Sequence, residues 1–243
     1  SAEYQLDAIF STDGDGDRPL VADEKGVWLR GDILGLLCAD VLKIEAVAIP
    51  VSCNTAVTSC GRFTKVALTK VGSPYVIAEF SELGKSFKRI AGFEANGGFL
   101  LGSDIEFLGE PLAALPTRDA VLPALMVLAA AGKSGISSLM INLPQRFTHS
   151  DRIKEFPTAR SQEILAAGIN NPDMLLARLG FEAVRVDSVD ITDGLRMTLN
   201  DGSIIHLRPS GNAPELRCYV ESDNPSTSHD MVYSCLYCLV NQA

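Results

Sequence analysis

The chain has 243 residues, 47% of them hydrophobic, so it is long enough to bury a large core in one or two domains. Its formal net charge of −9 argues against a general nucleic-acid-binding surface. The longest apolar run, at residues 120–132, contains Pro123 and is shorter than the roughly 18 residues of a membrane span, so we expect no membrane partner. No signal-peptide pattern opens the sequence, and the six scattered cysteines suit a reducing compartment, so we expect a cytoplasmic protein.

The first distinctive segment is DGDGDR at residues 13–18, in which Asp13, Asp15 and Asp17 alternate with glycines. Three like charges this close together repel one another unless a cation or strong donors neutralise them. Carboxylate oxygens are hard ligands and no His or Cys lies in this stretch, so we expect Mg²⁺, with Mn²⁺ or Ca²⁺ as further candidates. A solvated acidic turn is the alternative.

The same segment also matches an EF-hand loop, because Glu24 falls at position twelve when counting starts at Asp13. However, Arg18 stands where that loop needs Gly. The flanking segments QLDAIF and PLVADEKGVWLR predict strands, the second with a turn at residues 24–26, rather than the two helices of an EF-hand. A Ca²⁺-binding module is therefore only an alternative.

From residue 31 to residue 132, helical patterns alternate with buried apolar strands. Helices are predicted at 31–43, 54–63, 73–83 and 118–132, and strands at 44–52, 65–72 and 90–102. This alternation predicts an α/β layer with helices on both faces.

After about residue 155 the pattern changes. Residues 156–168 and 171–180 predict helix or linker, and residues 183–211 predict short alternating strands with Asp-Gly turns. The C-terminal segment is an apolar helical pattern, in which Cys235 and Cys238 are best explained as buried helix cysteines rather than a redox pair. The sequence therefore predicts a second, α+β domain.

Two further loops carry candidate binding residues. In GFEANGG at residues 92–98, Glu94 and Asn96 lie in a glycine-rich turn where they could hold vicinal hydroxyls, and a plain turn explains the pattern equally well. LRPSGNAPELR at residues 207–217 offers what a phosphate needs, namely guanidinium groups, a hydroxyl and free backbone N–H groups. Its candidate residues are Arg208, Ser210, Gly211, Asn212 and Arg217, and a structural Arg beside a tight turn is the alternative.

Taken together, these segments resemble the α-D-phosphohexomutases, a family that includes phosphomannomutase/phosphoglucomutase and the phosphoglucosamine and acetylglucosamine mutases. DGDGDR resembles the family's metal loop (residues 13–18), KVG its substrate-contacting lysine turn (70–72), FEANGG its sugar loop (93–98), and RPSGNAPELR its phosphate loop (208–217). All four occur in family order. The resemblance implies that residues 1–29 are the tail of the second domain, that 30–155 are the third domain with a mixed sheet, and that 156–243 are the fourth.

The resemblance implies interconversion of hexose 1-phosphate and hexose 6-phosphate through a bisphosphorylated intermediate. Mg²⁺ would be the metal, and hexose 1,6-bisphosphate would activate the whole enzyme. Hexose phosphates would be the partners, and the protein would be a monomer or a dimer. Arg18 and Lys70 would act in catalysis, Glu94, Asn96 and Gly97 would bind the sugar, and the phosphate loop would hold the phosphate that is not reacting. The family's phosphoserine domain has no counterpart in this sequence, so the chain alone is expected to be inactive, and none of the three histidines matches a family acid or base.

Two departures from the family pattern leave the substrate open. Asn212-Ala213 stands where the phosphate loop usually has Thr-Glu, and Asn96 stands where the sugar loop usually has Ser. The alternatives are therefore a phosphoglucosamine or acetylglucosamine mutase, and a non-catalytic sugar-phosphate binder.

Overall fold

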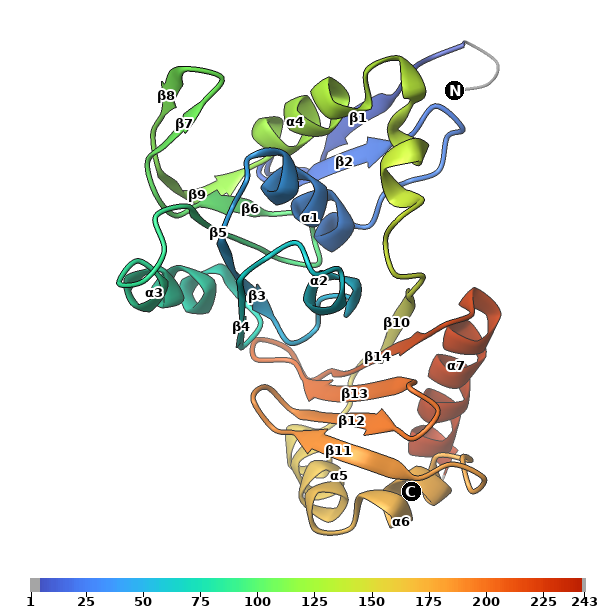
Figure 1. Ribbon diagram of the computed structural model, residues 1–243. Coiled ribbons are helices and arrows are strands. Elements are labelled where there is room, and N and C mark those ends of the chain that lie inside the picture. The colour runs from blue at the N-terminus through green and yellow to red at the C-terminus, as the bar shows by residue number, and fades with distance from the viewer. Residues whose placement is uncertain (1–4, 242–243) are drawn as a thin grey trace. The chain divides into compact units, whose positions relative to one another are not determined.

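The computed structural model describes residues 5–241, which divide into two compact units (Figure 1). Unit 1 ends at Pro144 and unit 2 begins at Gln145. No helix among the described residues is long and apolar enough to cross a membrane.

Unit 1 is built on a mixed five-stranded sheet with the order β4-β3-β5-β6-β9. Strand β3 pairs in parallel with β4 and β5, whereas β6 pairs antiparallel with β5 and β9. The strands are β3 (Ala46–Pro50), β4 (Lys65–Thr69), β5 (Ile90–Phe93), β6 (Phe99–Leu101) and β9 (Leu115–Asp119).

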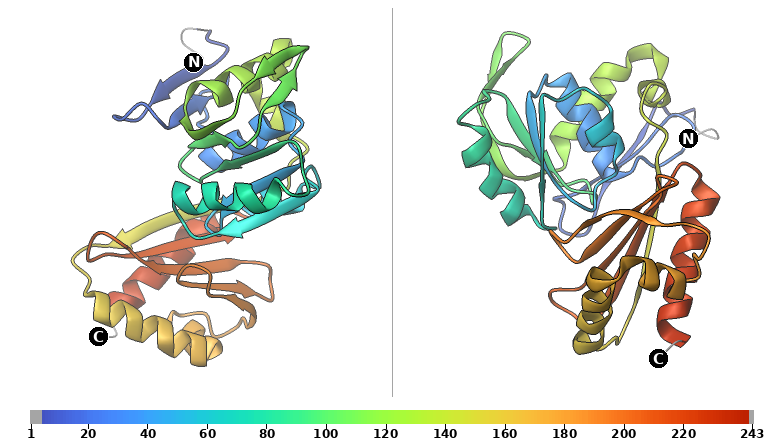
Figure 2. Two further views of the ribbon diagram at one scale, coloured as in Figure 1. Left: turned by 90° about the vertical axis from the view of Figure 1, so that its left-hand side faces the viewer. Right: turned by 60° about the horizontal axis from the view of Figure 1, so that its bottom comes forward.

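Helices cover both faces of this sheet, as the sequence predicts (Figure 2). Side chains of β3 alternate between the faces: Val47 and Ile49 join the core under α1 and α4, whereas Ala46 and Ala48 pack with α3. The helices are α1 (Gly31–Val41), α2 (Ala56–Ser59), α3 (Ser73–Leu83) and α4 (Val121–Ala131), followed by the 3₁₀ turns η1 (Gly132–Ser134) and η2 (Ile136–Met140).

Two hairpins complete unit 1. The first pairs β1 (Ile9–Thr12) with β2 (Pro19–Ala22) around the metal loop, and the turn expected at residues 24–26 follows it, closed by the Gly26 N–H donating to the Asp23 carbonyl at 2.9 Å. The second pairs β7 (Ile105–Phe107) with β8 (Glu110–Leu112) and was not predicted.

One strand prediction in unit 1 is wrong. Residues 90–102 form two antiparallel strands, β5 and β6, rather than a single strand. The chain reverses between them because the Gly97 N–H donates to the Glu94 carbonyl at 2.9 Å, and Gly97 takes a left-handed φ of +96° that suits glycine. The sugar loop is therefore the tip of a hairpin.

Unit 2 is an antiparallel sheet with the order β10-β14-β13-β12-β11, covered by helices on one face. The strands are β10 (Phe147–Ile153), β11 (Val186–Asp190), β12 (Leu195–Leu199), β13 (Ile204–Pro209) and β14 (Leu216–Ser222), and the helices are α5 (Thr158–Asn170), α6 (Pro172–Arg178) and α7 (Pro225–Asn241). This confirms the α+β prediction. The unit begins ahead of the join expected near residue 155, because β10 pairs along its whole length with β14.

Candidate functional site

The metal loop connects β1 to β2 in unit 1. One oxygen from each of Asp13, Asp15 and Asp17 lies within 4.8 Å of the others. Two backbone hydrogen bonds close the loop. The Asp13 N–H donates to the Arg18 carbonyl at 3.2 Å, and the Gly16 N–H donates to the Asp13 carbonyl at 3.1 Å. Because strands rather than helices flank this loop, the EF-hand interpretation is wrong.

Arginines partly balance the charge of this loop. Arg18 Nη1 lies 3.3 Å from Asp13 Oδ2, and Arg118 Nη1 lies 3.1 Å from Asp17 Oδ2. Asp17 Oδ1 is buried and has no hydrogen-bond partner, with Arg18 Nε 3.6 Å away. A buried carboxylate oxygen without a donor, beside two further carboxylates, fits a hard divalent cation.

The sugar loop lies at the tip of the β5–β6 hairpin. Glu94 is buried, and its Oε2 accepts a hydrogen bond from Arg118 Nε at 3.1 Å and forms an ion pair with Arg118 Nη2 at 3.1 Å. Asn96 is exposed, and its Oδ1 accepts from the Gly98 N–H at 3.1 Å. The amide NH₂ of Asn96 is therefore the group that can donate to a ligand.

The metal loop and the sugar loop form one cluster within unit 1. A Cβ on Gly97 would lie 3.0 Å from the carbonyl oxygen of Pro19, the first residue of β2. The start of α1 closes on the same turn, since a Cβ on Gly31 would lie 2.1 Å from the Gly97 nitrogen. Glycine is needed at position 31 for this approach of α1 to the sugar loop.

Arg118, on β9, is the residue of this cluster that the sequence did not reveal. Burial alone would lower its pKa, but the hydrogen bonds and charges of Asp17 and Glu94 outweigh burial and raise the pKa of the guanidinium. It is therefore a permanent cation held between the two loops. No local pattern marks it, because it lies 101 positions from Asp17.

Lys70 is placed differently from the rest of the predicted unit 1 site. It is exposed just after β4, and its Nζ lies 6.0 Å from the centre of the Tyr75 ring. None of the contacts described for residues 5–144 links it to the metal loop or the sugar loop. Its role in catalysis stays a prediction.

In unit 2, the phosphate loop connects β13 to β14. Arg208 Nε lies 2.6 Å from Asp193 Oδ2, and the Ser210 hydroxyl donates to Asn212 Oδ1 at 2.9 Å. The Ser210 N–H is already used, because it donates to the Glu215 carbonyl at 2.8 Å. Gly211, Asn212 and Pro214 are the exposed residues at the tip of this loop.

An arginine row on the same sheet extends the phosphate loop. Arg208, Arg217 and Arg152 stand opposite one another on β13, β14 and β10. Arg152 and Arg217 both lie near Glu215, at 3.6 and 3.5 Å, and the buried Nε of Arg217 has no hydrogen-bond partner. Arg152 and Arg217 also line a pocket of about 310 Å³ together with Ser150, Asp151 and Tyr219, and such a set suits an anion. No local pattern in the sequence marks Arg152, because only the strand register places it beside Arg217.

His206 lies on the same sheet face, and its environment does not suit a proton-transfer role. Its ring is buried and its Nε2 lies 2.6 Å from the Asp193 carbonyl. Burial lowers the pKa of this imidazole, so it stays neutral near pH 7.

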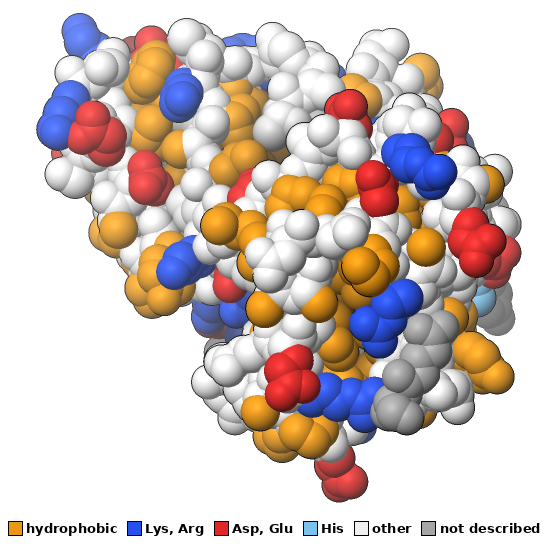
Figure 3. Space-filling view, turned by 90° about the horizontal axis from the view of Figure 1, so that it is seen from below, with side chains coloured by type: hydrophobic (Ala, Val, Ile, Leu, Met, Phe, Trp, Pro, Cys, Tyr) orange, Lys and Arg blue, Asp and Glu red, His pale blue; other side chains and the backbone are white. Residues whose placement is uncertain are grey.

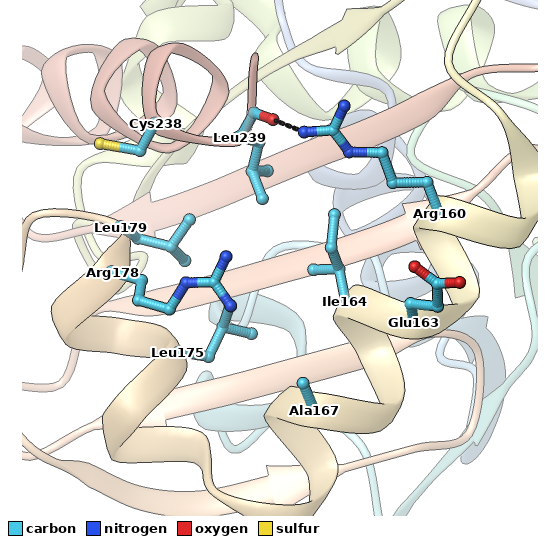
Figure 4. Close-up of a pocket in the computed structure, with 9 residues that line it drawn as sticks. All are labelled: Arg160, Glu163, Ile164, Ala167, Leu175, Arg178, Leu179, Cys238 and Leu239. Carbon is cyan, nitrogen blue, oxygen red and sulfur yellow. Dashed lines mark hydrogen bonds between the residues drawn. The ribbon is translucent and has the colours of Figure 1, made fainter. Parts of the chain in front are cut away.

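Unit 2 also contains a second cavity, of about 280 Å³, among α5, α6 and α7 (Figure 4). Its wall combines apolar side chains, with Leu175 and Leu179 on one side, and the charged side chains of Arg160, Glu163 and Arg178. Arg160 donates to the Leu239 carbonyl at 3.0 Å. Seen from below, hydrophobic side chains are interspersed with both signs of charge (Figure 3). None of the nine residues that line the cavity is a predicted site residue.

The comparison with family models identifies both units. Residues 30–147 match the phosphoglucomutase/phosphomannomutase alpha/beta/alpha domain III, and residues 150–232 match the C-terminal domain of the same family. The chain belongs to the phosphoglucomutase/phosphomannomutase family, whose domain III and C-terminal domain it carries.

Particular relatives agree. The chain is 53% identical over 234 residues to a phosphomannomutase of Salmonella muenchen, a match that covers 96% of this chain and 49% of the relative. It is 44% identical over 236 residues to a phosphomannomutase of Sinorhizobium fredii (strain NBRC 101917 / NGR234), covering 95% of this chain and 49% of that relative. The chain therefore spans about half the length of the curated relatives it matches.

Solved structures share the fold. A phosphoglucomutase/phosphomannomutase family protein of Burkholderia thailandensis matches with a TM-score of 0.69 at 18% identity, covering 100% of this chain and 49% of that one. An Aspergillus fumigatus N-acetylphosphoglucosamine mutase, solved in complex with GlcNAc-6P and magnesium, matches with a TM-score of 0.60 at 16% identity, covering 96% and 52% of the two chains.

Proposed function

We propose that this chain is the C-terminal portion of a phosphomannomutase/phosphoglucomutase that interconverts hexose 1-phosphate and hexose 6-phosphate. The observation that carries the proposal is the cluster in unit 1, where Arg118 contacts both Asp17 of the metal loop and Glu94 of the sugar loop. Carboxylates suited to a cation thus lie beside a carboxylate suited to sugar hydroxyls. The phosphomannomutase relatives support the same substrate class.

The proposed reaction is two phosphoryl transfers. In the first, the phosphoryl group leaves the oxygen of a phosphoserine, which takes up a proton, and bonds to a free hexose hydroxyl oxygen, which gives one up. In the second, the bisphosphate has reoriented and its other phosphoryl group bonds to the serine oxygen, which loses its proton, while the sugar oxygen that it leaves takes one up. We propose that this serine belongs to a domain N-terminal to the present sequence, in keeping with the half-length match to the relatives.

Residues of unit 1 would act at the reacting end of the substrate. Mg²⁺, when bound by Asp13, Asp15 and Asp17, would neutralise charge on the transferring phosphoryl group, as phosphoryl transfer requires. Arg18 would add to that positive field. Glu94 would accept hydrogen bonds from the sugar hydroxyls.

The remaining predicted residues would hold the substrate in place. Asn96 and Gly97 would contact the sugar. Lys70, which is exposed, would contact the substrate. In unit 2, the phosphate that is not reacting would be bound by Arg208, Ser210, Gly211, Asn212 and Arg217. Anchoring that phosphate positions the other end of the sugar for transfer.

The β1–β2 hairpin supports the proposal that residues 1–29 complete a domain whose remainder precedes this sequence. The hairpin forms a two-stranded sheet of its own, and the domain III match begins only at residue 30. Phe10 and Leu20 on this hairpin are 46% and 44% exposed, as expected for side chains that a larger domain covers.

Calorimetry on the 243-residue chain tests the proposed substrate class. In the presence of Mg²⁺ we expect binding of mannose 6-phosphate and glucose 6-phosphate, and no detectable binding of free mannose, because the phosphate supplies the charge-assisted bonds. A preference for glucosamine 6-phosphate or GlcNAc 6-phosphate would favour the alternative mutases. Absence of binding to every one of these phosphates would overturn the proposal.

A further inference from the structure

Arg118 joins two loops that are distant in the sequence. Its Nη1 lies 3.1 Å from Asp17 Oδ2, and its Nε and Nη2 each lie 3.1 Å from Glu94 Oε2. The Glu94 side chain is 4% exposed, whereas those of Arg118 and Asp17 are 24% and 32% exposed, so the bridge is shielded from solvent at its Glu94 end. Only a planar guanidinium can bind two carboxylates in this forked way, since a Lys ammonium is a single point charge.

The bridge engages one oxygen of each carboxylate. On Asp17 it uses Oδ2, whereas Oδ1 is the buried oxygen with no hydrogen-bond partner. On Glu94 both contacts described for the side chain fall on Oε2. Arg118 therefore orients both carboxylates while leaving Asp17 Oδ1 and Glu94 Oε1 outside its own contacts.

The fold is built to admit this side chain. A Cβ on Gly98 would lie 2.8 Å from Arg118 Cδ and 3.0 Å from its Cγ, so the absence of a side chain at position 98 gives the arginine stem its place. Strand β9 places Arg118 beside β6, because the next residue of β9, Asp119, pairs with Phe99 of β6.

We propose that Arg118 is a positioning residue that couples cation binding at the metal loop to sugar binding at Glu94. This inference rests on the proposed function. Because one guanidinium is shared by two carboxylates, a change of charge at one carboxylate alters how strongly Arg118 binds the other. A cation that neutralises Asp17 leaves Arg118 to pair more closely with Glu94. Removal of the Glu94 charge leaves Arg118 to pair with Asp17 alone, where its positive charge opposes the cation. The sugar binds best to a Glu94 side chain that Arg118 holds in place. Cation and sugar therefore favour the same state, in which Arg118 pairs with Glu94, and each strengthens the binding of the other.

A double-mutant cycle with Mn²⁺ alone tests the coupling without any sugar. Mn²⁺ affinity is measured by calorimetry for the wild-type chain, Glu94→Gln, Arg118→Lys and the double variant. We expect Glu94→Gln to weaken Mn²⁺ binding about fivefold when Arg118 is present and less than about twofold in the Arg118→Lys background. Loss of the Glu94 charge itself weakens Mn²⁺ binding equally in both backgrounds. The difference between the backgrounds therefore measures only the effect that passes through Arg118.

Arg62→Lys is the matched control. Arg62 has the same 24% exposure, lies in the same unit and forms an ion pair with Asp40. In its background, Glu94→Gln should retain the full effect. Circular dichroism and thermal unfolding check the fold of each variant, and Arg118→Gln, for which we expect the same loss of coupling, replaces Arg118→Lys if that variant unfolds. An equal effect of Glu94→Gln with and without Arg118 would overturn the inference.

Titration of mannose 6-phosphate with and without Mn²⁺ separates this inference from the proposed function. Mn²⁺ should tighten sugar-phosphate binding in the wild-type chain and in Arg62→Lys, and should not do so in Arg118→Lys. If the wild-type chain binds no hexose phosphate while the Mn²⁺ cycle shows coupling, the proposed function fails and the coupling stands. If hexose phosphate binds but the cycle shows no coupling, the inference about Arg118 fails alone.

Discussion

At the scale of single residues, the proposed phosphate ligand Arg208 is oriented by a neighbouring carboxylate. Its side chain is 13% exposed, and its Nε lies 2.6 Å from Asp193 Oδ2. That contact uses one of the three guanidinium nitrogens, so the two terminal nitrogens can form the parallel bonds that a phosphate accepts. The ion pair thus fixes the orientation of the guanidinium without consuming its binding edge.

We expect Arg208→Ala to weaken binding of mannose 6-phosphate by about 1.5–3 kcal/mol, the usual contribution of hydrogen bonds to a charged group. Calorimetry measures the affinity, and thermal unfolding shows whether the loss of the ion pair with Asp193 also lowers stability. Arg185→Ala is the control, because that guanidinium donates to the carbonyls of Glu182 and Val184 outside the phosphate loop. Unchanged affinity with unchanged stability would mean that the loop is only a turn.

Which site residues the sequence predicts depends on how local their partners are. Asp13, Asp15 and Asp17 could be predicted because one short loop brings their oxygens together. Arg118 and Arg152 could not, since Arg118 reaches a carboxylate 101 positions away and Arg152 meets Arg217 only through the register of β10 and β14. Pairing register is a long-range property that spacing along the chain does not encode.

At the scale of elements, the first turn of α1 and the tip of the β5–β6 hairpin define the site together. The atoms nearest to a Cβ on Gly31 are all backbone: Gly97 N at 2.1 Å, Gly97 Cα at 2.5 Å and the Ala95 carbonyl oxygen at 2.7 Å. Backbone cannot move aside as a flexible side chain can. The approach of this helix to the sugar loop therefore depends on one glycine.

Gly31→Ala should destabilise unit 1 by about 1–3 kcal/mol, the typical cost of overpacking, and weaken Mn²⁺ binding as the loops shift. Urea unfolding followed by fluorescence measures the loss, and Trp28, the only tryptophan of the sequence, lies in unit 1 and so reports on it. Gly14→Ala is the control for stability, because a Cβ there has no atom within 4 Å. Equal stability of the two variants would contradict the role given to Gly31.

Element types were predicted well where a periodic pattern was long, and less well at turns. The alternation of helix and apolar strand predicted α1, β3, β4 and α3. The single strand predicted at 90–102 is wrong because apolar residues flank the reversal on both sides, so the hydrophobic pattern continues while the chain turns. The β7–β8 hairpin was missed because its strands are three residues each, too short to show a period.

At the scale of the whole molecule, each unit has its own hydrophobic core. Unit 1 buries one cluster under α1 and α4 and another under α3, and unit 2 buries a single cluster between its sheet and its three helices. Units with separate cores can fold without further domains, so the chain should be folded when produced alone.

In the proposed mechanism, the metal loop, the sugar loop and the phosphate loop position a phosphoryl transfer whose donor is a serine of another domain. The chain alone, given mannose 1-phosphate, Mg²⁺ and a trace of glucose 1,6-bisphosphate, should therefore form no mannose 6-phosphate. Fusing the N-terminal half of the Salmonella muenchen phosphomannomutase to it should produce turnover, whereas the same fusion carrying Glu94→Ala should lose most of it. Turnover by the chain alone would refute the donor argument, and an inactive but folded fusion that still binds hexose phosphate would favour the non-catalytic binder.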